Sequence, residues 1–236
     1  MGCGALGSVA FEEIAKKALA TETPIELMLY DFDTVESPRN VASQNFRPNQ
    51  VGKYKIDCLL DIAEAYGLRA RGKPEKLGRG NILELMELEP GDIILDLVDN
   101  LPTRQLLWQT GLAQGAPVCH GAISQHGQGR VSWNYQAYDT FPLSPARLTE
   151  EQQASVATDK PQTLPPCELT KFRGLIVNTA LATVEALFIF LGSDASGEFK
   201  ALVEDGSTIG LITNWNSTSR GYEWDEKLTE QVEWNY

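Results

Sequence analysis

The chain begins MGCGALGS (residues 1–8), and the glycines at Gly2, Gly4 and Gly7 form the pattern G-x-G-x-x-G. In such a pattern the first glycine permits a sharp turn, the second lets a phosphate approach the backbone, and the third lets the next helix pack closely on a sheet. Residues 8–20 carry apolar side chains at helical spacing, which predicts a helix that begins at the turn. Its N-terminal N–H groups and partial positive charge suit a bound anion.

The same eight residues also resemble a lipidation signal, but that signal needs Ser or Thr where the chain has Leu6. No apolar run approaches the roughly 20 residues that cross a bilayer. The formal net charge of −12 argues against general binding to nucleic acids or to anionic membranes. We therefore expect a cytoplasmic protein with no nucleic-acid or membrane partner.

The cysteines Cys3, Cys58, Cys119 and Cys167 form no C-x-x-C pair. Neither a structural zinc site nor a disulfide framework is therefore expected. Cys3 is expected to be buried against the first helix, Cys58 lies in a predicted helix and Cys119 in a predicted strand, so all three are interpreted as core residues. The length of 236 residues is enough to bury a substantial core, so we expect one domain, 1–236.

The first half of the chain, residues 1–123, alternates between helical and strand-like segments, and the strand-like ones are apolar throughout. This pattern is typical of a doubly wound, Rossmann-like, mainly parallel sheet with helices on both faces. The expected strands are 24–33, 67–72, 92–99 and 116–124, and the expected helices are 8–20, 55–67, 81–91 and 101–115. Ligands of such sheets bind at the carboxyl ends of the strands.

The second half is organised differently, because residues 124–166 are rich in Gln, Ser, Thr and Pro and residues 167–236 contain a helix that is apolar almost all round. Such a helix is expected to be buried. The expected segments are an irregular crossover (124–166) with one strand (130–138), the buried helix (175–191), a closing antiparallel hairpin (199–205 with 208–215, joined by Gly206) and a solvated acidic tail (221–236).

Acidic side chains stand where two of the predicted strands end. Asp31 and Asp33 close the first strand, 24 and 26 residues after Gly7, and suit a carboxylate that binds ribose hydroxyls. Asp99 ends a later strand and is placed to hold Mg²⁺ against phosphates. Lys55 is placed to neutralise a phosphate. Each residue also has a plain structural interpretation: the aspartates as helix caps and Lys55 as a surface residue.

These residues belong to a set of motifs that resembles a known family. The motifs are G2-C-G-A-L-G7, D31-F-D33-T-V, N40-V-A-S-Q44, the phenylalanine of N-F46-R-P, V-G52-K-Y-K55 and D99-N100-L-P-T-R104. Together they resemble the ThiF/MoeB/HesA family, which is related to ubiquitin-activating enzymes. The resemblance runs from residue 2 to about residue 125, with a looser similarity around Cys167.

The resemblance implies a function: members bind Mg-ATP and adenylate a carboxylate, usually the C-terminus of a small ubiquitin-like or sulfur-carrier protein or peptide, with release of pyrophosphate. It implies that the glycine turn holds phosphates, that Asp31, with Asp33 beside it, binds the ribose, and that Asn40 and Lys55 contact the triphosphate. It also implies a homodimer. The resemblance further implies that Asp99 binds the metal ion, with Asn100 beside it, and that Ser43 lies in the nucleotide site. Cys167 stands where several members keep a cysteine that can attack the acyl-adenylate. The local sequence also fits an incidental thiol at Cys167.

The chain departs from the family pattern in three respects. Ser43 stands where the family usually carries an Arg that reaches for the phosphates, and the paired C-x-x-C zinc site of many members is missing. Only Met1 precedes Gly2, so the central strand that should lead into the turn is not in the sequence. We expect either that the natural reading frame begins further upstream or that a partner supplies the strand.

Three functions are compatible with these observations. The leading hypothesis is the ATP-dependent adenylyltransferase. The second is a nucleotide-binding interaction subunit of the same fold whose catalysis is weakened, as Ser43 suggests. The third is an NAD-dependent oxidoreductase, which fits the glycine turn but fits Lys55 and D99-N100…R104 poorly. His120 and His126, expected in a loop, are interpreted as scaffold rather than as an acid–base pair.

Overall fold

A computed structural model describes residues 1–123, 128–134, 173–192, 210–216 and 221–227. The first element is helix α1 (Ala5–Thr21), which starts directly after Gly4 and ends where Glu22 adopts a left-handed conformation. Its apolar residues are buried between two layers, helix α3 (Lys55–Tyr66) on one side and helix α7 (Arg173–Leu191) on the other. The helix predicted after the glycine turn is therefore confirmed.

The first sheet is a parallel pair, β1 (Glu26–Tyr30) and β2 (Arg69–Lys73), joined by α3 (Lys55–Tyr66). Tyr30 lies opposite Lys73, so the two strands end at the same edge. Two short helical segments, α2 (Arg39–Ser43) and η1 (Pro48–Gln50), lie between β1 and α3.

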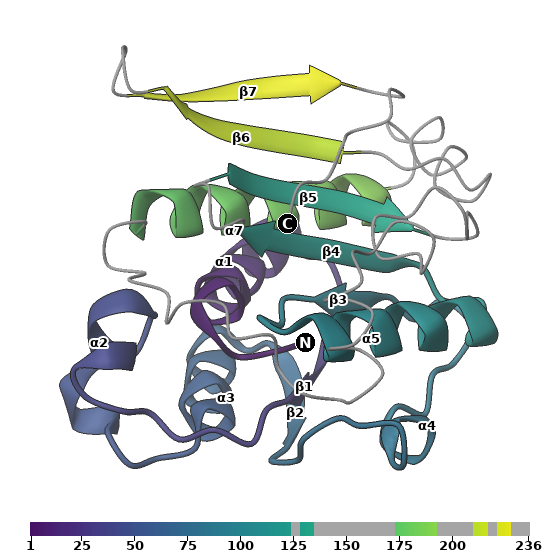
Figure 1. The fold of residues 1–236 in the computed structure, drawn as a ribbon. Helices are drawn as coiled ribbons and strands as arrows, with labels where there is room; N and C mark the ends of the chain where they lie inside the picture. The colour runs from purple at the N-terminus through teal and green to yellow at the C-terminus, as the bar shows by residue number, and fades with distance from the viewer. Residues whose placement is uncertain (124–127, 135–172, 193–209, 217–220, 228–236) are drawn as a thin grey trace.

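The second sheet has the order β3-β4-β5-β6-β7. Figure 1 shows these strands following one another from the middle of the view to its top. Strands β3 and β4 are parallel and β4 to β7 are antiparallel. The bounds are β3 Ile94–Asp96, β4 Val118–Ile123, β5 Gln128–Asn134, β6 Gly210–Asn216 and β7 Gly221–Lys227.

Two further helices complete the described fold. Helix α5 (Leu101–Gln114) connects β3 to β4 and ends at Gly115 in the left-handed conformation. Helix α7 (Arg173–Leu191) packs against α1, β4 and β5. In the described residues α7 alone is long and apolar enough to cross a membrane by length and composition, and 61% of its apolar window is buried within the fold. The expectation of a buried helix here is confirmed.

The two sheets are separate in the described part of the chain, and β1 pairs with a strand on one side only. On the other side Met1 makes two backbone contacts: its ammonium donates to Met28 O (3.2 Å), and its carbonyl accepts from Tyr30 N (3.1 Å). Burial lowers the pKa of this ammonium. A further strand beside β1 stays a prediction.

The structure corrects several expectations for the second sheet. A mainly parallel sheet with a C-terminal antiparallel hairpin was expected; the described pairings are parallel for β1–β2 and β3–β4 and antiparallel from β4 to β7, so the antiparallel part begins earlier than expected. The acidic tail is wrong for residues 221–227, which form β7 paired with β6; the sequence GYEWDEK alternates aromatic and charged residues, a strand period that its acidity masked. The expected partner run, 199–205, lies outside the described residues.

Several expected elements are shorter than predicted, and strand β3 and helix α4 show why. Strand β3 ends at Asp96 rather than at residue 99, because the Asp96 carboxylate accepts from Val98 N (3.1 Å) and bends the chain out of the sheet. Helix α4 (Ile82–Leu85) ends well before residue 91, because Met86 leaves helical geometry (φ −100°, ψ 78°) with its side chain buried.

Candidate functional site

The glycine turn is closed by contacts that only glycine permits. A Cβ at Gly7 would lie 1.8 Å from the carbonyl oxygen of Gly2, and a Cβ at Gly2 would lie 3.0 Å from Val98 Cγ1. A Cβ at Gly4, the residue before α1, would meet no atom within 4 Å. The first and third glycines therefore hold the turn against α1 and β3, while the second faces open space at the helix N-terminus, where an anion is favoured.

This contrast makes the turn testable by a matched pair of substitutions. Gly7→Ala is expected to lower the free energy of unfolding by roughly 1–3 kcal/mol, because the backbone of the turn must move. Gly4→Ala is expected to leave stability nearly unchanged and to weaken nucleotide binding instead. Urea unfolding and a nucleotide titration of both variants measure the two effects, and equal destabilisation would contradict the assignment.

Asp31 ties the end of β1 to the glycine turn. Its Oδ2 accepts from Cys3 N (2.9 Å) and its Oδ1 accepts from Asp33 N (2.9 Å). Burial raises the pKa of this carboxyl, although the two backbone donors and Lys55 act in the opposite direction. A carboxylate has about four acceptor positions, so Asp31 retains lone pairs for the hydroxyls of a ligand at the turn.

Asp33 and Lys55 form an ion pair beside Asp31. Lys55 Nζ lies 2.7 Å from Asp33 Oδ2, and the Lys55 side chain is only 6% exposed whereas that of Asp33 is 49% exposed. Lys55 is the first residue of α3, and its N–H donates to Asp33 O (3.0 Å). The structure therefore brings three of the predicted residues together, with a buried ammonium at their centre.

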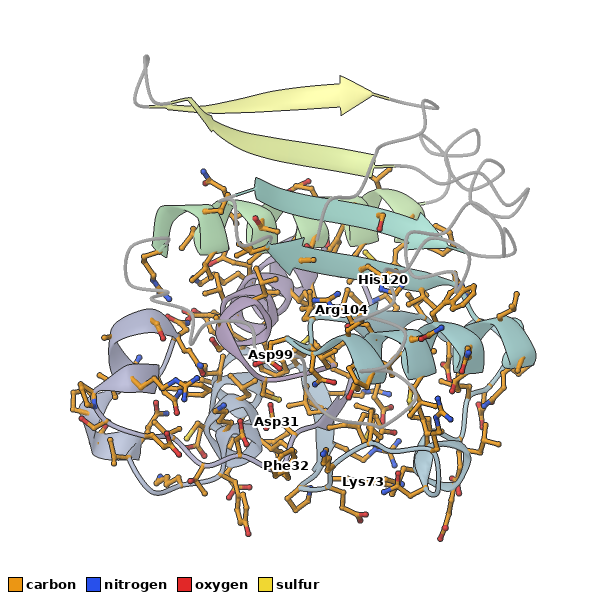
Figure 2. All side chains as sticks on the ribbon, in the orientation of Figure 1. Asp31, Phe32, Lys73, Asp99, Arg104 and His120 are labelled. Atoms are coloured by element: carbon orange, nitrogen blue, oxygen red, sulfur yellow. The ribbon has the colours of Figure 1, made fainter. Side chains whose placement is uncertain are left out.

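Asp99 directly follows the two residues that Gly2 faces. Gly2 packs against the backbone of Leu97 and the side chain of Val98, which places the following Asp99 next to it; Figure 2 shows Asp99 and Asp31 in the same part of the molecule. Asp99 is exposed, and in the described residues its carboxylate has no hydrogen bond or ion pair. It is therefore available for a cation.

In the part of the chain that the structure describes, the site can hold a magnesium ion only as part of a metal–nucleotide complex. The described residues contain no cluster of three or more His, Cys, Asp or Glu side chains that would enclose a metal ion. Mg²⁺ bound with a nucleotide needs only one or two carboxylates, because phosphate oxygens and waters supply its other ligands. Asp99 can supply such a carboxylate beside the turn.

Three other predicted site residues make local contacts. Asn40 is buried and its Oδ1 accepts from Glu36 N (2.7 Å). Ser43 is also buried, and its hydroxyl donates to a carbonyl one turn earlier in α2 (2.7 Å). Asn100 caps α5, since its Oδ1 accepts from Thr103 N (2.9 Å). These side chains shape the loops around the site, and Asn40 keeps its amide donors.

A buried charged cluster that the sequence analysis missed lies behind Asp99. Asp96 Oδ2 contacts Arg104 Nη1 (3.0 Å) and His120 Nδ1 (2.5 Å), and all three side chains are buried. Arg104 also donates to Val98 O and to Gly121 O (2.9 Å). Figure 2 shows Arg104 and His120 close together. The cluster thus fixes the loop that carries Asp99 to the ends of β3 and β4.

His120 lies within β4, which agrees with the strand expected at 116–124 and not with the loop in which His120 was grouped with His126. Burial and the Arg104 charge lower its pKa, against the opposing effect of Asp96. Asp96 itself has a lowered pKa, since Arg104 and His120 outweigh the cost of its burial. Asp96 lies opposite His120 in the parallel pairing of β3 with β4, and this register brings the two side chains together. The sequence alone does not give the register. His126 lies outside the described residues.

A neutral buried histidine makes stability depend on pH. In the unfolded chain His120 has its ordinary pKa of about 6.5, so it binds a proton below that pH. In the folded protein its pKa is lower and it stays neutral there. Stability therefore falls as the pH falls from about 6.5 towards the pKa of the folded state. We expect a smaller urea midpoint at pH 5.5 than at pH 7.5, and a weaker dependence in His120→Gln. His126→Gln is the comparison; an equal change in both variants would contradict this prediction.

The cysteines show no nucleophile among the described residues. Cys3, Cys58 and Cys119 are buried, as predicted, and burial raises the pKa of each thiol. Cys167 lies outside the described residues.

The turn, the strand-end carboxylates and the buried lysine define an α/β protein of the kind that binds nucleotides at the carboxyl ends of its strands. The family model of the ThiF family matches residues 1–210, and the chain belongs to this family. The resemblance inferred from the motifs is confirmed.

Two curated relatives are similar in sequence. The SAMP-activating enzyme E1 of Haloferax volcanii is 24% identical over 217 residues, which are 90% of this chain and 74% of the relative. The ubiquitin-like modifier-activating enzyme 5 of Dictyostelium discoideum is 30% identical over 154 residues, 54% of this chain and 36% of the relative.

Solved structures of E. coli MccB are similar in fold. The complex with ATP has a TM-score of 0.65 at 13% identity, and the complex with MccA-N7isoASN has a TM-score of 0.66 at 13% identity. Each comparison covers 96% of this chain and 62% of the MccB chain. The chain is thus shorter than these neighbours, and at this identity they show the fold alone.

Proposed function

We propose that this chain is an ATP-dependent adenylyltransferase that activates the C-terminal carboxylate of a small ubiquitin-like or sulfur-carrier protein, or of a peptide. The observation that carries the proposal is the contact of the Asp31 carboxylate with Cys3 N of the glycine turn, with the buried Lys55 and its partner Asp33 beside it, in a member of the ThiF family. Two curated relatives named for activating small modifier proteins support the substrate class.

The reaction joins one carboxylate oxygen of the substrate to the α-phosphorus of ATP and breaks the bond between that phosphorus and the bridging oxygen of the β-phosphate. Pyrophosphate leaves with the bonding electron pair, and the product is an acyl-adenylate. No proton transfer is required when the attacking carboxylate is ionised. Catalysis therefore depends on positioning and on stabilising negative charge.

The residues of the site have separable tasks in this reaction. Asp31 accepts hydrogen bonds from the ribose, and the turn at Gly4 with the N-terminus of α1 supplies N–H groups to the phosphates. Lys55 stabilises the negative charge that develops in the transition state. Mg²⁺, when bound, neutralises phosphate charge, and Asp99 is the residue that would hold it. Asn40, whose Oδ1 is engaged by Glu36 N, would use its amide donors on the same ligand.

An exchange assay tests the proposal directly. Incubation with ATP, Mg²⁺, labelled pyrophosphate and candidate carrier proteins or peptides is expected to return label to ATP only in the presence of a carboxylate substrate. Substrate lacking its free C-terminal carboxylate is the control. Binding of NADH without affinity for ATP would instead favour the oxidoreductase.

The inward-facing, uncharged Ser43 favours one second candidate, a nucleotide-binding subunit with weakened catalysis. This subunit would bind Mg-ATP and a partner protein without exchanging pyrophosphate. Binding measured by calorimetry together with absent exchange would select it.

We also propose a cytoplasmic homodimer and an acyl-accepting role for Cys167, both from the family resemblance. Light scattering tests the dimer. A Cys167→Ser variant tests the cysteine, because adenylation should persist while a thioester to the substrate disappears.

A further inference from the structure

Arg173, the first residue of α7, reaches back to the first half of the chain. Its Nη1 donates to the backbone carbonyl of Ser43 (3.1 Å), 130 residues earlier in the sequence. The Arg173 side chain is half-buried. Helix α7 packs along α1, so the start of α7 lies beside the same layer that carries the glycine turn. A guanidinium is thus placed next to α2 by a distant segment.

The charge of this guanidinium is not balanced by a carboxylate in the part of the chain that the structure describes. By contrast, Lys16 on α1 contacts Glu12 and Glu13, Lys17 contacts Glu185, and Lys55 contacts Asp33. Arg173 instead donates to a neutral carbonyl. A guanidinium carries five N–H donors in a planar fork, and within the described residues only the donor on Nη1 has an acceptor.

The contact at Ser43 also locates Arg173 relative to the turn. Two residues beyond Ser43, Asn45 N donates to Ser8 Oγ (3.0 Å), and Ser8 N donates to Gly4 O (2.8 Å). Two residues span at most about 7 Å. Arg173 therefore stands within reach of the first turn of α1, on the side of Ser8, whereas Asp31 contacts the turn from the side of Cys3.

We propose that Arg173 binds the outer phosphates of the nucleotide triphosphate and supplies from α7 a positive charge that α2 lacks at Ser43. This inference rests on the proposed function. With Asp31 on the ribose at one side of the turn, the phosphate chain runs towards Ser8 and ends near the guanidinium. The bond to Ser43 O orients the fork, and the free N–H groups suit a phosphate because bidentate contacts from arginine are strong and directional.

The test compares triphosphate and monophosphate binding in variants of Arg173. Arg173→Ala is expected to weaken Mg-ATP binding about 10- to 100-fold, as the loss of a charged hydrogen bond does, and to leave AMP binding and the urea midpoint unchanged. The affinity of Arg173→Lys for Mg-ATP is expected to lie between those of the wild type and Arg173→Ala. Added guanidinium ion should restore part of the ATP affinity of Arg173→Ala. Arg71→Ala removes an exposed arginine on β2 and is the matched control.

The outcomes separate this inference from the function it depends on. Wild-type protein without affinity for Mg-ATP would overturn both. Normal ATP affinity in Arg173→Ala would overturn the role of Arg173 alone. An equal loss of ATP and AMP affinity would do the same, because it indicates a structural effect and not a contact with the outer phosphates. If Arg173→Ala does not fold, the same criteria apply to Arg173→Gln, which keeps a donor for the Ser43 carbonyl.

Discussion

Lys55→Met is expected to lower the rate of ATP–pyrophosphate exchange by about 100-fold or more, the size of effect seen when one preorganised charge-stabilising group is removed. Lys55 is a buried ammonium that faces the carboxylates of the site. Methionine has a similar length and fits an apolar environment, so the fold should survive. The loss of charge also leaves Asp33 unpaired beside the phosphates. Exchange kinetics at saturating substrate, with circular dichroism to verify folding, measure the effect.

Lys53→Met is the matched control, because Lys53 lies two residues away with a side chain that is 55% exposed and a distant contact to Asp61 (3.8 Å). Its exchange rate is expected to stay within about twofold of the wild type, since an exposed ion pair contributes little. If the Lys55 and Lys53 variants exchange pyrophosphate at equal rates, Lys55 is not a catalytic residue. That result would also weaken the proposed function.

Asp96→Ala is expected to lower the free energy of unfolding by about 3–5 kcal/mol, because removing one member of a buried ion pair leaves an uncompensated charge. The charge left behind is the Arg104 guanidinium, which Asp96 neutralises from a fully buried position. His120 loses its partner at the same time. Urea unfolding at pH 7.5 measures the change in midpoint and slope.

Asp61→Ala is the control for this experiment, since its side chain is 63% exposed. Its effect is expected to stay within about 0.5 kcal/mol, as for most surface substitutions. Asp96→Asn keeps the shape of the side chain and one acceptor oxygen. Its loss in free energy of unfolding should lie between those of Asp96→Ala and Asp61→Ala. The assignment of Asp96 as the centre of the buried cluster does not stand if Asp96→Ala unfolds at the same urea concentration as Asp61→Ala.

Much of the site was predictable because its residues lie in short motifs at element ends. Gly2, Gly4 and Gly7 predicted a turn with a helix behind it, and the structure has both. Asp31 and Asp33 were expected at the end of a strand, and they lie directly after β1. Because Asp31 and Asp33 follow the same strand two residues apart, the sequence alone predicted that they would lie together at its carboxyl end.

The same local logic misjudged residues whose role depends on distant partners. Composition favoured a solvated tail at 221–227, but pairing with β6 makes it a strand. Asn100 also caps α5 through its Oδ1, a contact that was not expected, and its place in the nucleotide site stays a prediction.

The amino-acid sequence by itself determined the turn, the helices α1, α3 and α5, the parallel start of the fold and membership of the ThiF family. These features depend on periodicity, capping and backbone freedom, which act over a few residues. Only the tertiary structure decided that Asp96, Arg104 and His120 share one buried cluster and that Arg173 meets Ser43. Those contacts depend on strand register and on the packing of α7 against α1, and neither is encoded in any short stretch of the chain.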